Sequence, residues 1–143
     1  PLQGGDCGDP KEQSHLMSAK LLIVDDDKSI REVVEISLED DWIVITAASG
    51  AEALEKAASE NPALILLDRM MPGMDGLETL HRLRELPQTK STPIIFLTAK
   101  VQSQEIATYA NLDIIGVLSK PFDPMTLSAE IATLLRNAGA DKN

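Results

Sequence analysis

Acidic residues stand directly after two short apolar runs of the sequence. Asp25, Asp26 and Asp27 follow the run KLLIV, and Asp68 follows the run ALILL. Carboxylates held close together raise one another's pKa and destabilise a site unless a cation joins them. A cluster that offers only oxygen ligands, without Cys or a nearby His, suits Mg²⁺ with bound water better than Zn²⁺. These acids are therefore candidate Mg²⁺ ligands.

A hydroxyl and a cation follow two further apolar runs. Thr98 comes after PIIFL, and Lys120 comes shortly after IIGVL. Lys120 could bind an added phosphoryl group, which brings about −1.5 to −2 charge and three acceptor oxygens, and Thr98 could donate its hydroxyl to the same group. The alternatives are a helix-capping turn at Asp25 to Asp27, a surface ion pair of little energetic value at Lys120 and an ordinary strand residue at Thr98. The combination with Asp68 favours a functional site.

The apolar runs themselves predict the elements that position these side chains. Each run is short, is bounded by polar or turn residues and lacks strict alternation, as is typical of strands covered on both faces of a parallel sheet. The five predicted strands are 20–24, 42–46, 63–67, 93–97 and 114–118.

Segments with helical periodicity separate the strands. Ser49 and Glu52 have the spacing of a capping box, Asp75 is a candidate N-cap, and Asp123 is an N-cap candidate with Pro124 at the first helical position. The helix expected at 101–109 has the weakest pattern.

The strand and helix signals alternate along the whole chain. Right-handed crossovers then produce an α/β fold: a doubly wound, five-stranded parallel sheet flanked by five helices, flavodoxin-like (βα)5. Ligands of such sheets bind beyond the carboxyl ends of the strands. The acids, Thr98 and Lys120 all stand at such ends.

Length and composition limit the other possibilities. The chain of 143 residues is the size of one domain, expected over 20–138 with a short tail at 139–143. Residues 1–19 show no periodic pattern of apolar residues. We expect them to be a flexible leader that was added for expression, with Met17 as a candidate native start. The net charge of −10 disfavours direct binding to nucleic acid or membranes. With no signal peptide and no membrane span evident, we expect a cytoplasmic protein.

Four motifs in order, LLIVDDD, LILLDRMMPGMDG, PIIFLTA and GVLSKPF, resemble the receiver domain of bacterial two-component response regulators, including chemotaxis regulators. The resemblance covers Lys20 to about Asn137. It implies that Asp68 accepts a phosphoryl group from a histidine kinase or a histidine phosphotransfer protein, and that Thr98 and Lys120 bind the phosphoryl oxygens. The implied Mg²⁺ ligands are Asp26, Asp68, the backbone carbonyl of Met70 and, through water, Asp25.

The sequence also departs from the usual receiver pattern. Val117 stands where many receivers carry a Tyr or Phe that changes rotamer on activation, so we expect signalling through the 99–110 segment instead. We expect the 101–135 face to bind a downstream protein target or effector domain, or to form a homodimer. The resemblance further implies a cis Lys120–Pro121 bond, and that Met70 and Lys100 tune the lifetime of the phosphoryl group.

Three other functions remain as alternatives. A small Mg²⁺-dependent phosphohydrolase with Asp68 as nucleophile would need an acid two residues later, where Met70 stands. A degenerate receiver that acts only as a binding module conflicts with the complete set of expected site residues. Dinucleotide binding would need a G-x-G-x-x-G motif after the first strand, which the sequence lacks.

Overall fold

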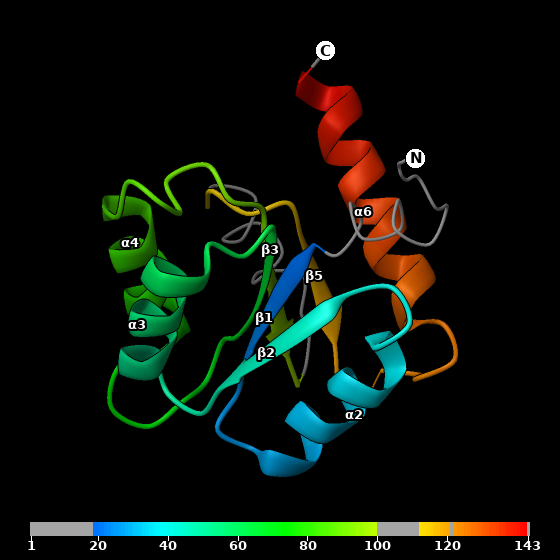
Figure 1. Cartoon of the computed structure of the whole chain (residues 1–143), viewed down its shortest axis with the longest axis horizontal. Coiled ribbons are helices and arrows are strands. Elements are labelled where there is room, and N and C mark those ends of the chain that lie inside the picture. The colour runs from blue at the N-terminus through cyan, green and yellow to red at the C-terminus, as the bar shows by residue number, and fades with distance from the viewer. Residues whose placement is uncertain (1–18, 100–111, 121, 143) are drawn as a thin grey trace, which may run out of the picture.

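A single parallel sheet forms the centre of the molecule. The computed structural model describes residues 19–99, 112–120 and 122–142, the last four of them by their backbone only. The strands lie in the order β2-β1-β3-β4-β5 (Figure 1), which confirms the predicted flavodoxin-like arrangement. Their bounds are β1 Lys20–Val24, β2 Ile43–Ala47, β3 Leu64–Asp68, β4 Ile94–Thr98 and β5 Gly116–Ser119.

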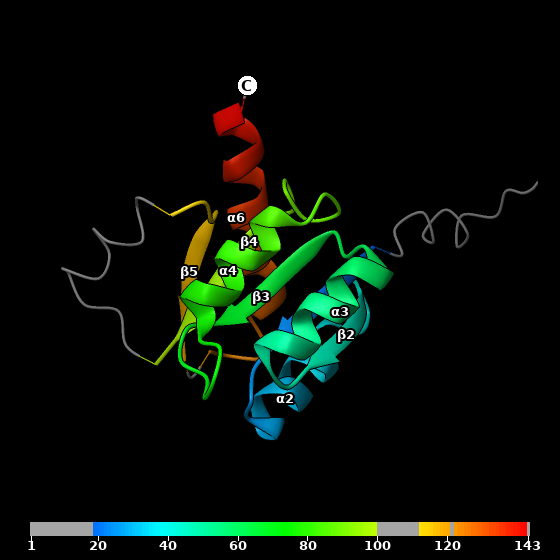
Figure 2. The same cartoon turned by 90° about the vertical axis from the view of Figure 1, so that its left-hand side faces the viewer.

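Helices cover both faces of this sheet. Figures 1 and 2 show α3 and α4 on one face and α2 and α6 on the other. The helix predicted at 101–109 lies outside the described residues. The bounds of the described helices are α2 Lys28–Leu38, α3 Gly50–Glu60, α4 Gly76–Glu85 and α6 Leu127–Lys142.

The side chains of β1 explain the unbroken apolar runs. Leu22 and Val24 belong to the core beneath α3 and α4, whereas Leu21 and Ile23 belong to the core beneath α2 and α6. All four are 0% exposed. Because successive side chains of a strand point to opposite faces, a strand covered on both faces is apolar at every position.

Two predicted helix caps are confirmed. The Ser49 side chain accepts a hydrogen bond from the Glu52 N–H at 3.1 Å, and the Asp75 side chain accepts one from the Glu78 N–H at 3.0 Å. Each bond satisfies an N–H group that has no partner within its own helix. These caps set where α3 and α4 begin, on the side of the sheet where the strands end.

The last helix begins later than predicted. Residues 124–126 form a turn, and α6 begins at Leu127, whose N–H donates to the Asp123 carbonyl at 3.0 Å. Asp123 caps that turn through a 2.9 Å bond from the Met125 N–H. The helix then continues to Lys142.

Candidate functional site

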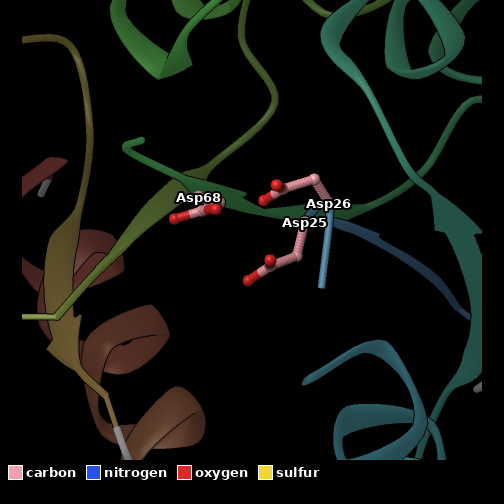
Figure 3. Close-up of side chains that lie close together, drawn as sticks. All are labelled: Asp25, Asp26 and Asp68. Atoms are coloured by element: carbon pink, nitrogen blue, oxygen red, sulfur yellow. The ribbon is translucent and has the colours of Figure 1, made fainter. Parts of the chain in front are cut away.

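Three carboxylates meet beyond the ends of β1 and β3. The two strands are direct neighbours, with Val24 paired to Leu67, so Asp25 and Asp68 come to the same edge of the sheet. Asp25, Asp26 and Asp68 each offer a carboxylate oxygen, and these oxygens lie within 4.8 Å of one another (Figure 3). The crowding predicted from the strand ends is therefore present.

Asp25 is held from all sides and is fully buried, at 0% exposure. Its N–H donates to the Ala47 carbonyl at 3.1 Å, and its own carbonyl accepts a 2.8 Å bond from Nη1 of Arg31. Its Oδ1 accepts the Asp27 N–H at 2.9 Å, and its Oδ2 lies 2.8 Å from Nζ of Lys120. Both backbone groups and both carboxylate oxygens of Asp25 thus have neighbours that restrict it.

The three consecutive acids have different roles. Asp27 is the N-cap of α2, and its side chain accepts the Ser29 N–H at 2.9 Å. The helix-capping alternative is therefore correct for Asp27. Asp26 is exposed and takes part in the acid cluster, whereas Asp25 is buried within it. Residues of identical chemistry differ here because the strand end and the helix start orient them differently.

Lys120 joins the two buried acids. Its Nζ lies 2.8 Å from Oδ2 of Asp25 and 3.1 Å from Oδ1 of Asp68, and its side chain is only 18% exposed. The N–H of Lys120 donates to the Thr98 carbonyl at 2.7 Å, which ties the end of β5 to that of β4. Burial alone would lower the Lys120 pKa, but the close contacts with the two acids and their charges outweigh it and raise that pKa.

Asp68 has an unusually weak acid group. Burial and, secondly, the charge of Asp25 raise the pKa of Asp68 to about 6, although Lys120 and the Met70 N–H act in the opposite direction. The residue is only 3% exposed. The carboxylate is thus still ionised at neutral pH but is poorly stabilised, and an added cation would relieve this condition.

The loop after β3 ends at Gly76, the first residue of α4, which lies close to Asp68. The Gly76 N–H donates to the Arg69 carbonyl at 3.0 Å, and a Cβ at this position would lie 2.5 Å from the Asp68 carbonyl oxygen. Only glycine permits this approach without a backbone shift. Gly73 in the same loop has φ of +77°, which glycine adopts without strain.

Comparison with known proteins identifies the family. The family model described as "Response regulator receiver domain" matches residues 21–132. The chain belongs to the response regulator receiver domain family. The resemblance stated from the motifs is thereby confirmed.

Named relatives agree with this assignment. The receiver domain is 39% identical over 123 residues to the alkaline phosphatase synthesis transcriptional regulatory protein PhoP of Bacillus subtilis, which covers 85% of this chain and 50% of PhoP. It is 38% identical over 125 residues to the response regulator Rre1 of Synechocystis, covering 86% and 54%. The chain thus spans about half the length of these curated relatives.

A solved structure has the same fold. The chemotaxis protein CheY4 of Vibrio cholerae superposes with a TM-score of 0.76 at 38% sequence identity, covering 81% of this chain and 98% of that one. Among the described residues of the receiver domain, no helix is both long and apolar enough to cross a membrane.

The other predicted site residues are placed as follows. Thr98 is the last residue of β4, pairs with Ser119 of β5 and is 6% exposed. The Met70 side chain is 68% exposed, while its N–H contacts Oδ1 of Asp68 at 3.4 Å. Val117 packs partly buried against the core on the α3 and α4 side. Lys100, Pro121 and the segment 101–109, for which a helix was predicted, lie outside the described residues.

Two contributors to the site were absent from the sequence predictions. Arg31 contacts the Asp25 carbonyl, and Gly76 permits the close approach at Asp68. A usable signal existed for Arg31, because side chains in the first turn of a helix lean toward the N-terminus and so toward the preceding acids. No comparable signal distinguishes Gly76 from an ordinary turn glycine.

The donor set of the receiver domain fits Mg²⁺. All three clustered side chains offer hard oxygen ligands, as Mg²⁺ prefers. Within the described part of the chain, Oδ2 of the buried Asp25 receives no hydrogen bond of suitable geometry, although Lys120 lies beside it. A buried, incompletely satisfied oxygen next to two further carboxylates is the condition that a bound cation or its water would satisfy.

Proposed function

We propose that Asp68 is the phosphoacceptor of this receiver domain and that its phosphorylation depends on Mg²⁺. The observation that carries the proposal is the convergence of a buried, poorly stabilised Asp68 with two further acids and Lys120 beyond the strand ends. A carboxylate is already ionised at neutral pH, so its attack on phosphorus requires no general base. The obstacle is charge repulsion between the acid and the phosphoryl donor.

The two carboxylate oxygens of Asp68 have different contacts, and we use this difference to propose which one attacks. Both Lys120 Nζ and the Met70 N–H contact Oδ1, at 3.1 and 3.4 Å, so we assign the attack to Oδ2. A bond forms between Oδ2 and phosphorus, the phosphorus–nitrogen bond of a donor phosphohistidine breaks, and its electron pair returns to the imidazole. The product is an acyl phosphate on Asp68.

The remaining residues neutralise charge and position the phosphoryl group. Mg²⁺, when bound, would offset the negative charge of the acids and of the phosphoryl oxygens. Asp26, Asp68 and the Met70 carbonyl would hold it directly, and Asp25 would do so through water. The Lys120 ammonium would turn from the acids toward the new phosphoryl oxygens, beside the Thr98 hydroxyl at the end of the adjacent strand.

The partners follow from this chemistry. We propose a histidine kinase or a histidine phosphotransfer protein as donor, and a downstream protein or effector domain as the recipient of the signal. PhoP is named a transcriptional regulatory protein, which supports an output of this kind. The 101–135 face is our candidate for partner binding or homodimer formation. We propose no turnover of external phosphoesters.

Mass spectrometry after incubation with acetyl phosphate tests the proposal. With Mg²⁺ we expect one labile phosphoryl group per chain, and we expect none when Mg²⁺ is omitted from the incubation or when Asp68 is replaced in Asp68→Asn. Asp40→Asn is the matched control, because it removes the same charge from an exposed turn. Equal labelling of Asp68→Asn would disprove the assignment, and steady hydrolysis of p-nitrophenyl phosphate would favour the hydrolase alternative.

A further inference from the structure

A guanidinium group contacts the backbone of the loop that carries the acids. Nη1 of Arg31 donates to the Asp25 carbonyl at 2.8 Å, six residues back along the chain. Arg31 lies in the first turn of α2, where its own N–H donates to the Asp27 carbonyl at 3.2 Å. Helical side chains lean toward the helix N-terminus, so this long side chain naturally reaches the preceding loop.

Together with a second contact, this bond holds the peptide groups on either side of Asp26. The Asp25 carbonyl belongs to the peptide group that precedes Asp26, and Arg31 binds it. The Asp27 N–H belongs to the peptide group that follows, and it donates to Oδ1 of Asp25 at 2.9 Å. Asp26 itself is exposed. The direction of its carboxylate therefore depends on how its two flanking peptide groups are held.

We propose that Arg31 is a positioning residue for the metal site. It holds the Asp26 carboxylate close to that of Asp68, so that both can bind the same metal ion. The inference rests on the proposed Mg²⁺ site and deepens it. Asp26 is the only exposed member of the acid cluster among the described residues, so it is the ligand with the least packing to fix it. Residues that orient direct ligands commonly change metal affinity about 10- to 100-fold when removed.

The positive charge of Arg31 should weaken Mg²⁺ binding, whereas its positioning role should strengthen it, and this difference makes the proposal testable. A cation near the acids repels Mg²⁺, so its removal would strengthen Mg²⁺ binding if charge alone mattered. Part of this charge is offset by Glu52 of α3. The pKa of Glu52 is lowered chiefly by the hydrogen bond from Ala48, then by Lys56, and also by the charge of Arg31. The positioning role therefore predicts weaker Mg²⁺ binding when Arg31 is removed, and its charge alone predicts tighter binding.

The test is titration of the full chain with Mg²⁺ alone, with binding measured by amide NMR and by calorimetry. Arg31→Met keeps the length of the side chain and removes the donors, and we expect about 10-fold weaker Mg²⁺ binding. Arg136→Met is the matched control: Arg136 is exposed on α6, and its side chain donates to Oγ1 of Thr133 at 3.3 Å, far along the chain from the acids. The control should bind Mg²⁺ as the wild type does.

Arg31→Lys provides a second variant that retains the positive charge and an N–H donor group but not the guanidinium. We expect its affinity to lie between those of wild type and Arg31→Met. In the absence of metal, the amide signals of Asp26 and Asp27 should shift in Arg31→Met more than those of residues beyond the loop. This readout is independent of Mg²⁺ binding and of phosphorylation.

The outcomes separate the inference from the proposed function. Unchanged or tighter Mg²⁺ binding in Arg31→Met, with a wild type that binds, overturns the positioning role alone. A wild type that shows no Mg²⁺ binding overturns the metal site and the inference together. If Arg31→Met fails to fold, wild-type affinity in Arg31→Lys together with unshifted Asp26 and Asp27 amides overturns the inference.

Discussion

Replacing Asp68 by Asn should stabilise the metal-free receiver domain, although it should abolish phosphorylation. In the wild type, Asp68 is 3% exposed and carries its charge beside that of Asp25, which the single ammonium of Lys120 offsets only in part. Asn keeps the size of the side chain and can still accept a hydrogen bond from Lys120. The substitution thus removes an unfavourable charge with little change in packing.

The magnitude follows from the pKa of Asp68, which the fold raises from 3.8 to about 6. At pH 8 this rise corresponds to about 3 kcal/mol of destabilisation by the ionised group. Because Asn pairs with Lys120 less strongly than a carboxylate does, we expect a net gain of about 1 to 3 kcal/mol. For a domain of this size such a gain raises the urea midpoint by about 1 M.

The pH dependence of the free energy of unfolding provides a second test of the same explanation. A group with a raised pKa contributes its stability in the protonated form, fully below pH 3.8, and loses it as pH rises through about 6. The advantage of Asp68→Asn should therefore be near zero below pH 4 and complete above pH 7. Mg²⁺ should reduce the advantage of Asp68→Asn. At a Mg²⁺ concentration of about ten times the Kd, binding stabilises the wild type, but not the variant that lacks the ligand, by about 1.4 kcal/mol.

Urea unfolding followed by circular dichroism, at pH 4 and pH 8 with and without Mg²⁺, measures these differences. Asp40→Asn provides the control for net charge, since this residue is exposed in a turn, and it should change the midpoint little. A less stable Asp68→Asn at pH 8 without Mg²⁺ would refute the reasoning. So would an advantage that is equally large at pH 4.

Two further predictions concern neighbouring residues. Lys120→Met should lower the free energy of unfolding by about 3 kcal/mol at pH 8, because it leaves two buried acids without their cation. Urea unfolding should show a smaller decrease at pH 5. An equal decrease at both pH values would argue against the charge explanation. Gly76→Ala should cost about 1 to 3 kcal/mol, because its Cβ would meet the Asp68 backbone oxygen at 2.5 Å. Gly73→Asn is the control in the same loop, and wild-type stability and Mg²⁺ affinity of Gly76→Ala would contradict the close approach.

Local rules made much of the fold readable from the sequence. The strand pattern was visible because a sheet covered on both faces needs apolar residues at every position, as β1 shows. The caps at Ser49 and Asp75 were visible because a side-chain acceptor just before a helix satisfies N–H groups that the helix cannot. Asp68 and Lys120 were found because parallel strands deliver their end residues to one edge.

Tertiary structure alone decided how Asp25 and Asp26 are used. Asp25, Asp26 and Asp27 are chemically identical. Only the contacts of Asp25 with the Ala47 carbonyl and with Lys120 bury the first and leave the second exposed, whereas the cap at Asp27 is a local bond to the Ser29 N–H. The start of α6 was mispredicted because the bonds to Asp123 close a turn before the helix.

The contact of Arg31 with the acid loop and the close approach at Gly76 are likewise features of the assembled fold. Each depends on the distance between segments that local propensity does not encode. Sequence pattern reports which side chains must be buried or capped, because those costs are local. Which buried groups then meet, and with what change in pKa, depends on packing between elements distant in the chain.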